Sequence, residues 1–481
     1  MMLLSQAAQV LGGELIGPDK LFTSVSTDSR VIAAGGLFVA LHGPNFNGAE
    51  FTASATQRGA VGSLLSRASY SGGATSGTIL LVPDARLALG QLAAHWRARF
   101  QLRLVAITGS NGKTTVKEML ASVLRAATGN ADAVLATQGN LNNDIGMPLT
   151  LLKLRAGHRY AVIEMGMNHS GEIDYLTRLA RPDIAIINNA SSAHLAGLGS
   201  VEAVARAKGE IFAGLGANGI AVINADDEHA PLWRALAGVP IIDFALGRSA
   251  AVQVRWQPQD FGATLQISTP AGDFAAQLQV PGVHNVRNAL AATAAAVALG
   301  IALPQIAAGL EKFSGVAGRL QRKSARCGAT LLDDTYNANP ASLQSALEVL
   351  AQASGEKILV LGDMGELGDD AARLHREIGA AARQIGINKL LALGELSIHA
   401  VQGYGAGAQH YAEIDSLLAA LDKQLTADVT VLVKGSRFMR MERVVQHCVG
   451  ATPGVKQNNI EQPQCLVRAP ATPQPQNGGS V

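Results

Sequence analysis

A glycine-rich loop between a predicted strand and a predicted helix constrains the fold of this chain more than any other feature. The loop consists of Gly109, Ser110, Asn111, Gly112, Lys113, Thr114 and Thr115. The apolar residues 104–108 before it predict a strand, and residues 116–127 after it predict a helix. Glycines in such a loop let successive backbone N–H groups point at phosphate oxygens, and the helix N-terminus adds partial positive charge. The order of these parts therefore predicts a parallel sheet that binds a nucleotide phosphate.

The side chains of this loop indicate which phosphate compound binds. Lys113 has the reach to contact the β- and γ-phosphates of ATP, and the Thr114 hydroxyl can serve as a Mg²⁺ ligand. The general pattern GxxxxGK[ST] has glycine where this chain has Ile107, so the loop is a variant. The alternative is a glycine turn with an incidental lysine. We expect ATP binding, because strand, loop, lysine, hydroxyl and helix follow one another in the required order.

Apolar strands alternate with helical stretches after about residue 100, which predicts two doubly wound α/β units. The first has strands at 104–108, 160–164, 183–188 and 220–224, with antiparallel hairpins at 251–281; the second has strands at 330–332, 358–361, 390–393 and 429–433. Before them, strand-like runs at 37–41 and 78–82 and a helix at 86–100 form an N-terminal segment. We therefore predict a three-domain α/β fold with boundaries 1–100, 101–316 and 317–452, followed by a disordered tail, 453–481, rich in Pro, Gln, Asn and Gly.

Composition excludes several classes of partner. The chain has 481 residues, 48% hydrophobic and 16% charged, with a formal net charge of only +2, so nothing in its charge favours nucleic acid or an anionic membrane. The most membrane-like stretch, residues 289–303, is too short to span a bilayer and is predicted to be a buried helix. The N-terminus lacks a basic region, and the three cysteines show no CxxC spacing. We expect a cytoplasmic protein with reduced thiols that acts as a monomer.

Polar residues near the ends of the predicted strands are candidates for a site, because ligands bind at the carboxyl ends of parallel strands. Glu164 ends one strand and suits a Mg²⁺ ligand, although a turn carboxylate is the alternative. His194 follows the next strand and, taken alone, resembles an ordinary loop histidine. Lys208 lies on a predicted helix and by itself resembles a solvated surface lysine. Residues 137–146 form an amide-rich loop that either its own turns or a ligand could satisfy.

The second α/β unit carries its own polar strand ends. They are the segments DDTYNANP at 333–340, GDMGE at 362–366 and KGSR at 434–437. Each can be explained by turn chemistry, but three in one small domain predict a polar rim that faces a cleft. In the preceding segment PGVHN, Asn285 is explained as a helix cap.

Taken together, these motifs resemble the Mur ligase family, the ATP-dependent amino-acid-adding enzymes of peptidoglycan synthesis. The stretches that carry the resemblance follow in the family's order: TGSNGKTT, TQGNLNNDIGMPLTLL, AVIEMGMNHSGEI, AHLAGLGS, AKGEIF, PGVHNVRNALAA, GRL, LLDDTYNANPAS, VLGDMGELG and VLVKGSR. TGSNGKTT matches the family's own phosphate loop, which accounts for Ile107. The resemblance runs from Leu15 to Val445, essentially all of the chain except the tail.

The resemblance implies a domain for a UDP-sugar peptide, a central P-loop ATPase domain and a Rossmann-like C-terminal domain that closes over the nucleotide. It implies two Mg²⁺ ions held by Thr114, Glu164, His194 and a carbamylated Lys208, in which the cation has become a carboxylate-like ligand. Lys113, Lys208, Glu164 and His194 are then the catalytic residues. Besides the loop 109–115, the residues that would approach ATP are Asn288 and Arg319 near the adenosine and Asp334 near the ribose. The residues that would bind the other substrates are Thr27, Asp28, Ser29, Arg30, Asn140, Asn142, Asn143, Tyr336, Asn337 and Lys434.

The segments STDSR and GLFVALHG resemble the uridine-nucleotide part of those family members that join D-alanyl-D-alanine to UDP-N-acetylmuramoyl-tripeptide. The reaction then expected is amide formation through an acyl phosphate. A family member that adds a single amino acid, or glutamate to a folate, is the nearer alternative, and the NLNND loop and STDSR argue against folate. A P-loop kinase would make no amide. A nucleotide-dependent transport partner would need a membrane-docking surface and its own signature, and the sequence shows neither.

Overall fold

The computed structural model describes residues 1–43, 46–70, 72, 77–191, 198–259 and 261–450. It divides the chain into two compact units, Met1–Leu89 and Gly90–Val455, and the second unit contains two separate large sheets. With the sheet of the first unit this makes three α/β domains, which confirms the predicted fold class. The predicted boundaries at 100, 316 and 452 stay predictions. The tail expected at 453–481 lies outside the described residues.

The first unit is built on a five-stranded sheet in which four strands are parallel. In spatial order the strands are β2 (Glu14–Ile16), β9 (Thr78–Val82), β8 (Gly62–Ser66), β5 (Gly36–Ala40) and β4 (Ser24–Ser26). The two predicted strands correspond to β5 and β9, whose residues are all buried. Strand β8 was not predicted, because its glycine and two serines interrupt the apolar run. Helices α1 (Leu4–Leu11) and α2 (Thr52–Gln57) belong to this unit, together with two short antiparallel pairs, β1 (Met2–Leu3) with β3 (Leu21–Phe22) and β6 (His42–Gly43) with β7 (Phe46–Asn47).

The central domain has a nine-stranded sheet that contains the phosphate loop. In spatial order the parallel strands are β11 (Val134–Ala136), β12 (Tyr160–Glu164), β10 (Arg103–Thr108), β13 (Ile184–Ile187), β14 (Ile220–Asn224), β15 (Ile241–Ala245) and β16 (Val252–Gln259). The antiparallel strands β17 (Gly262–Thr269) and β18 (Gly272–Leu278) complete it, as the hairpin prediction required. The first strand in sequence, β10, lies between β12 and β13, so the chain leaves it in both directions. The carboxyl ends of these three strands meet at a topological switch point, where open sheets bind ligands.

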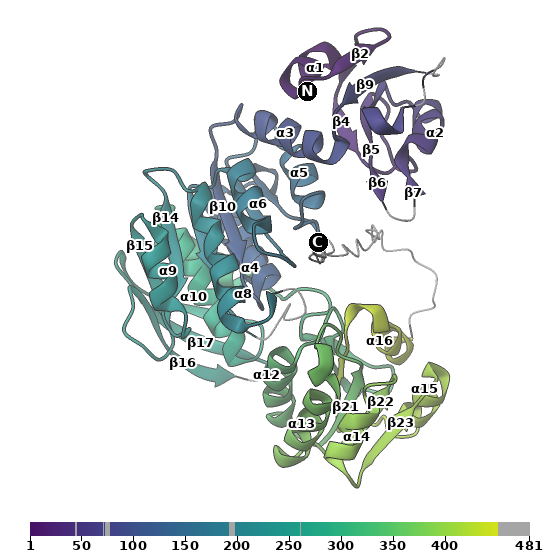
Figure 1. Ribbon diagram of the computed structural model, residues 1–481. Coiled ribbons are helices and arrows are strands. Elements are labelled where there is room, and N and C mark those ends of the chain that lie inside the picture. The colour runs from purple at the N-terminus through teal and green to yellow at the C-terminus, as the bar shows by residue number, and fades with distance from the viewer. Residues whose placement is uncertain (44–45, 71, 73–76, 192–197, 260, 451–481) are drawn as a thin grey trace, which may run out of the picture. The chain divides into compact units, whose positions relative to one another are not determined.

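Helices cover this sheet in two layers. One layer consists of α4 (Lys113–Thr128), α10 (Val283–Ala298) and α11 (Leu303–Glu311), which pack on one another and on the strands. The other helices described in the domain are α5 (Gly146–Leu151), α6 (Glu172–Ala180), α8 (Val201–Gly209) and α9 (Ala230–Ala237). Helix α3 (Ala85–Arg97) begins in the first unit and ends in the second. Figure 1 shows α6, α8 and α9 together over the sheet. Residues 289–296 of the alanine-rich stretch are buried in α10, as predicted, but the helix ends at Ala298, before the predicted end at residue 303.

Ile107 has a packing explanation in this arrangement. Its side chain is fully buried in the apolar cluster beneath α4 and α10. In the ladder it lies opposite Glu164 on one side and Ile186 on the other, one residue before the strand ends. Residue 107 therefore lies in strand β10 and in the hydrophobic core, not in the loop. An isoleucine at this position does not disturb the phosphate-binding turn.

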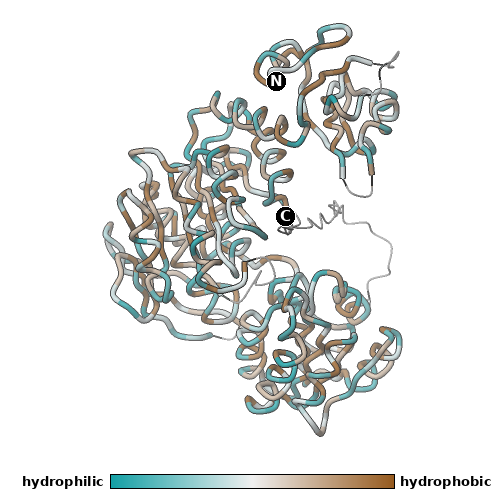
Figure 2. The backbone as a smooth tube through the Cα atoms, viewed as in Figure 1, coloured by the Kyte–Doolittle hydropathy of each residue, from teal (hydrophilic) through white to brown (hydrophobic). Residues whose placement is uncertain are grey.

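The C-terminal domain has a six-stranded sheet, parallel except for its first edge. In spatial order the strands are β19 (Gln321–Ser324), β20 (Thr330–Asp334), β24 (Val429–Lys434), β21 (Glu356–Gly362), β22 (Lys389–Leu393) and β23 (Ala408–Tyr411). Helices α12 (Pro340–Ala351), α13 (Ala371–Gln384) and α14 (Ile398–Tyr404) enclose one apolar cluster, and α15 (Ile414–Asp422) and α16 (Glu442–Val449) the other. Figure 2 shows the interior strands of both large sheets as predominantly hydrophobic. This is the pattern of parallel strands covered on both faces.

Two further expectations concern membranes and cysteines. Among the described helices none is long and apolar enough to cross a membrane. Cys448 is buried and Cys327 is exposed, both as free thiols. Burial raises the pKa of the Cys448 thiol to about 12, which keeps it protonated and unreactive.

Candidate functional site

The phosphate loop joins the end of β10 to the start of α4. Gly112 immediately precedes the helix with φ +81°, a conformation that favours glycine. A Cβ atom at this position would also collide with the side-chain amides of Asn288 and Asn188. Two independent constraints thus require glycine, and they leave the first N–H groups of α4 available at the carboxyl edge of the sheet. That is the arrangement in which a helix N-terminus binds phosphate.

A network of asparagines holds this loop in place. Asn188 Nδ2 donates to the Asn111 carbonyl at 2.9 Å and to Asn288 Oδ1 at 3.0 Å. Asn189 Oδ1 accepts from the Asn111 N–H at 2.9 Å, and its Nδ2 donates back to the Asn111 carbonyl at 3.1 Å. Sequence reasoning assigned no role to Asn188 or Asn189. The signal was present, since both follow a parallel strand where polar side chains meet ligands.

Lys113 begins α4, and its ammonium group turns back over the loop. Its Nζ donates to the Gly109 carbonyl at 2.6 Å and to the Ser110 carbonyl at 3.3 Å. Burial lowers the pKa of Lys113, the charge of Glu164 raises it, and the charge of Arg319 lowers it further. A cation is therefore held among the backbone groups that would surround the phosphates.

Glu164 lies directly beside Thr114, as the strand-end argument predicted. Thr114 Oγ1 donates to Glu164 Oε2 at 2.9 Å, and Asn142 Nδ2 donates to the other carboxylate oxygen at 2.8 Å. The Glu164 backbone N–H donates to Thr137 Oγ1 at 2.9 Å, and the buried Lys117 donates to the Thr137 carbonyl at 2.5 Å. Two residues of the amide loop thus hold Glu164, Asn142 at its carboxylate and Thr137 at its backbone N–H. Lys117 and Thr137 were not identified from the sequence, because neither stands in a recognisable motif.

Lys208 is buried, so the interpretation of it as a solvated surface lysine is wrong. It is 1% exposed near the end of α8. Burial and the neighbouring charge of Lys113 hold its pKa well below the ordinary value for lysine. No ion pair with a carboxylate is formed by Lys208 within the part of the chain that the structure describes. The third predicted metal ligand, His194, lies outside the described residues.

These groups are of the kind that bind a hard cation together with a nucleoside triphosphate. Glu164 supplies a carboxylate and Thr114 a hydroxyl, both oxygen donors of the kind Mg²⁺ prefers. Glu164 is 2% exposed, and within the described chain its carboxylate is bound by neutral groups only, so its negative charge is not compensated by an ion pair. A divalent cation would supply that compensation, and a buried lysine that is readily neutral can react with carbon dioxide to give a further oxygen ligand.

Arg319 brings a second positive charge to the phosphate loop from the start of the C-terminal domain. Its Nη2 donates to Thr114 Oγ1 at 3.3 Å, and its guanidinium carbon lies 4.1 Å from the centroid of the Tyr336 ring. Its Nε is buried without a hydrogen-bond partner among the described residues. Asn339 Nδ2 also reaches the loop, donating to Asn111 Oδ1 at 3.0 Å. The sequence associated Arg319 with adenosine, whereas the structure places its guanidinium at the hydroxyl beside Glu164.

The other predicted contacts to ATP lie around this loop. Asn288 accepts from Asn188, and its own Nδ2 donates to Asn285 Oδ1 at 3.2 Å. The interpretation of Asn285 as a helix cap is wrong, because Gly282 occupies the cap position of α10 without a side-chain cap hydrogen bond. Asn285 lies in the first turn of the helix, and its side chain donates to the Pro281 carbonyl at 2.7 Å. Next to it, His284 is half-buried, and desolvation lowers its pKa to about 4. His284 is therefore a neutral imidazole at physiological pH.

The polar rim predicted in the C-terminal domain forms, but its charges are paired. Lys434 Nζ donates to Asp334 Oδ2 at 2.5 Å and to the Asn337 carbonyl at 3.0 Å. The Asn337 side chain accepts from the N–H of Ala338 at 2.9 Å. Thus two residues expected to contact ribose and substrate, Asp334 and Lys434, bind each other in the described structure.

The predicted N-terminal contacts form a compact turn in the first unit. Arg30 donates to both carboxylate oxygens of Asp28, at 2.9 and 2.8 Å, and Ser26 Oγ donates to the Asp28 carbonyl at 3.0 Å. Ser29 is buried and Thr27 is half-buried.

Two further predicted residues lie in the amide-rich loop of the second unit. The Asn143 side chain accepts hydrogen bonds from two backbone N–H groups and so shapes the loop, while Asn140 is exposed.

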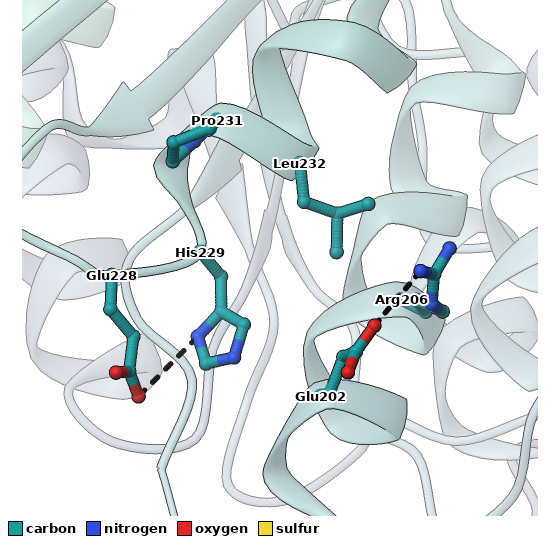
Figure 3. Close-up of a pocket in the computed structure, with 6 residues that line it drawn as sticks. All are labelled: Glu202, Arg206, Glu228, His229, Pro231 and Leu232. Atoms are coloured by element: carbon teal, nitrogen blue, oxygen red, sulfur yellow. Dashed lines mark hydrogen bonds and ion pairs between the residues drawn. The ribbon is translucent and has the colours of Figure 1, made fainter.

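A surface depression between α8 and α9 is separate from this site. Figure 3 shows its lining residues, which are Glu202, Arg206, Glu228, His229, Pro231 and Leu232. Arg206 pairs with Glu202 at 2.9 Å, and His229 Nδ1 lies 3.2 Å from Asp227 and 3.9 Å from Glu228. None of these residues belongs to the phosphate loop or contacts it. The paired charges indicate an ordinary surface feature.

Comparison with protein families identifies all three parts of the chain. A family model described as "Mur ligase family, catalytic domain" matches residues 21–97. A model described as "Mur ligase middle domain" matches residues 107–296. A third, described as "Mur ligase, glutamate ligase domain", matches residues 318–437. The three matches follow the order of the three sheets.

Individual relatives match over nearly the whole length. The UDP-N-acetylmuramoyl-tripeptide–D-alanyl-D-alanine ligase of Escherichia coli (strain K12) is 42% identical over 450 residues, which are 92% of this chain and 97% of that one. A crystal structure of MurF from Acinetobacter baumannii superposes with a TM-score of 0.85 at 35% identity, covering 93% of this chain and 98% of that chain. The structure of MurF ligase from Thermotoga maritima in complex with ADP gives a TM-score of 0.79 at 26% identity, covering 90% and 98%.

Proposed function

The chain belongs to the Mur ligase family, and from this we propose that it joins D-alanyl-D-alanine to UDP-N-acetylmuramoyl-tripeptide. The reaction converts ATP to ADP and orthophosphate and gives the UDP-muramoyl-pentapeptide precursor of peptidoglycan. The observation that carries the proposal is the 42% identity to a ligase of that name over 97% of its length. The site supports it, because the half-buried Lys113, the buried Lys208, a carboxylate and an arginine lie around one phosphate loop.

The chemistry explains why such a site needs positive charge. A carboxylate resists attack by an amine, because its charge repels nucleophiles and its oxygen is a poor leaving group. Transfer of the γ-phosphoryl group of ATP to that carboxylate gives an acyl phosphate, from which phosphate leaves readily. The transfer brings two anions together, so it depends on cations placed around the γ-phosphate.

Six side chains are proposed to act in this step. Lys113 neutralises charge on the β- and γ-phosphates, and the N–H groups of residues 109–115 orient them. Arg319 lies beside Thr114 and stabilises the charge that spreads over the transferring group. Thr114, Glu164, His194 and a carbamylated Lys208 would together hold two Mg²⁺ ions. Bound there, Mg²⁺ supplies further positive charge to the phosphate oxygens.

The amine of D-alanyl-D-alanine then attacks the acyl carbon. A tetrahedral intermediate forms, and Lys113 and Arg319 are proposed to stabilise its oxyanion before phosphate departs. Water would hydrolyse the acyl phosphate, so the site must exclude it. The contacts from Arg319 to Thr114 and from Asn339 to Asn111 support closure of the C-terminal segment over the loop. Residues Thr27, Asp28, Ser29 and Arg30 are proposed to bind the uridine nucleotide, and Asn140, Asn142 and Asn143 the muramoyl peptide.

The dependence of phosphate release on the amine tests this assignment. With UDP-N-acetylmuramoyl-tripeptide and ATP, we expect phosphate release only when D-alanyl-D-alanine is added, and not with D-alanine or L-lysine alone. The reason is that the acyl phosphate persists in a closed site until a fitting amine attacks. Release with a single amino acid would instead favour another Mur-type amide ligase. Release with a folate and glutamate would overturn the assignment.

A further inference from the structure

Lys117 is a buried lysine one helical turn beyond the phosphate loop. It stands on α4, three residues after Thr114, and is 1% exposed. Its Nζ donates to the Thr137 carbonyl at 2.5 Å and lies 2.9 Å from a carboxylate oxygen of Glu118. Burying an ammonium group is costly, and an apolar side chain of similar length would fill the same space without that cost. The contacts of Lys117 therefore need an explanation beyond packing.

The ion pair with Glu118 does not supply that explanation. The Glu118 side chain is 32% exposed, so water screens its charge. Its second carboxylate oxygen lies 4.0 Å from Arg125, which stands on the same helix. A partly solvated carboxylate that has a second cation beside it contributes little to holding a buried lysine. The hydrogen bond to the Thr137 carbonyl is then the specific contact of Lys117.

This hydrogen bond closes a ring of contacts around Glu164. Thr137 Oγ1 accepts from the Glu164 N–H at 2.9 Å, and Glu164 Oε2 accepts from Thr114 Oγ1 at 2.9 Å. Thr114 and Lys117 are three residues apart, so they lie on one face of α4. The helix thus holds Glu164 at two points, directly at its carboxylate and through Thr137 at its backbone.

The position of Thr137 determines where the end of β12 lies. Its N–H donates to the Val162 carbonyl at 3.0 Å, which extends the ladder between β11 and β12 by one residue. Strand β11 is the edge strand of the sheet, so Thr137 has a strand neighbour on one side only. Lys117 supports it from the helix layer. A displacement of Thr137 would therefore pass directly to the Glu164 backbone.

We propose that Lys117 is a positioning residue for Glu164, holding the end of β12 so that the carboxylate lies beside Thr114, where a divalent cation would bind. The proposal rests on the proposed function, since it takes Glu164 as a metal ligand. Lys117 acts through Thr137 and not on a substrate. Residues that orient a metal ligand in this way typically account for a difference of about 10–100-fold in metal affinity or activity.

Binding of Mn²⁺ tests the proposal without turnover. Lys117→Met keeps the length of the side chain and removes the charge and the donor. In the presence of ADP, we expect this variant to bind Mn²⁺ at least about tenfold more weakly than the unaltered chain, as followed by electron paramagnetic resonance. Glu118→Gln is the matched control, because it removes the ion pair and leaves the hydrogen bond to Thr137. Its affinity for Mn²⁺ should be unchanged.

Substitutions of Thr137 test the other half of the link, and they do so even if Lys117→Met fails to fold. Thr137→Val removes the hydroxyl that accepts from the Glu164 N–H and keeps the carbonyl that Lys117 binds. It should reproduce the loss of Mn²⁺ affinity, whereas Thr137→Ser, which retains a hydroxyl, should not. In the double variant of Lys117→Met with Thr137→Val the two losses should not add, because both act through one link. Fully additive losses would overturn the proposal.

Hydrogen exchange reports the position of the strand end without metal or substrate. The Glu164 amide should be protected in the unaltered chain and in Glu118→Gln, and should exchange at least about tenfold faster in Lys117→Met. The Val162 amide of the same strand should keep its protection, which shows that the sheet stays folded. Unaltered exchange at Glu164, or an equal loss of Mn²⁺ affinity in Lys117→Met and Glu118→Gln, would overturn the proposal. These results would stand even if the amine-dependence test rejected the assigned substrates.

Discussion

Lys113→Ala should abolish ATP-dependent phosphate release, with a loss of about 10³-fold or more, the effect typical of removing a cation that stabilises a transferring phosphoryl group. The reason is geometric: Lys113 Nζ lies within 3.3 Å of two loop carbonyls, among the N–H groups that would surround the phosphates. Alanine preserves the helix start, since it is the best helix former. ADP formation in the presence of both other substrates is the measurement.

A matched control substitution distinguishes loss of catalysis from loss of folding stability. Lys312 is an exposed lysine just beyond α11 in the same domain. Lys312→Ala should retain full activity and the same unfolding midpoint as Lys113→Ala. ADP formation by Lys113→Ala above about one tenth of normal would contradict the role assigned to the phosphate loop.

Lys208→Ala should lose about 10²–10³-fold in kcat, the range found when one group that stabilises transition-state charge is removed. Short carboxylic acids such as formate or acetate should then restore part of the activity. Lys208 is 1% exposed, so its truncation leaves an internal space beside the phosphate loop that a small carboxylate can enter. A carboxylate there replaces the carbamate oxygens that would hold the metal ion.

The choice of additive makes this test specific. If Lys208 acted as a cation, methylamine would restore activity and acetate would not. Lys113→Ala, which removes a true cation from the same site, should not respond to acetate. Normal turnover by Lys208→Ala without any additive would refute the carbamate.

The fold could be predicted in detail where a buried strand is a continuous apolar run. The predicted strands 160–164 and 220–224 coincide with β12 and β14, because such strands are continuous apolar runs. Strands β19 and β23 were missed. Both lie at the edges of the C-terminal sheet, and the sequence of β19, QRKS, has no apolar residue to reveal it.

The site could be predicted only in part, because some of its residues are brought together by tertiary packing and not by their own segments. Glu164 could be placed because the end of a parallel strand marks the ligand edge of a sheet. Lys208 could not, since its burial arises from packing between α8 and its neighbours rather than from its own segment. The positive φ of Leu320, +52°, was equally hidden, because a leucine gives no local signal for it. Only the resemblance to a family supplied roles for such residues.

Transfer of a labelled oxygen tests carboxylate activation most directly. UDP-N-acetylmuramoyl-tripeptide carrying ¹⁸O in its terminal carboxylate is incubated with ATP and D-alanyl-D-alanine, and the phosphate is analysed by mass spectrometry. An acyl phosphate forms by attack of that carboxylate on the γ-phosphorus, so one ¹⁸O atom should leave with each phosphate released. Phosphate without the label, accompanied by amide formation or by AMP, would contradict phosphoryl transfer to the carboxylate.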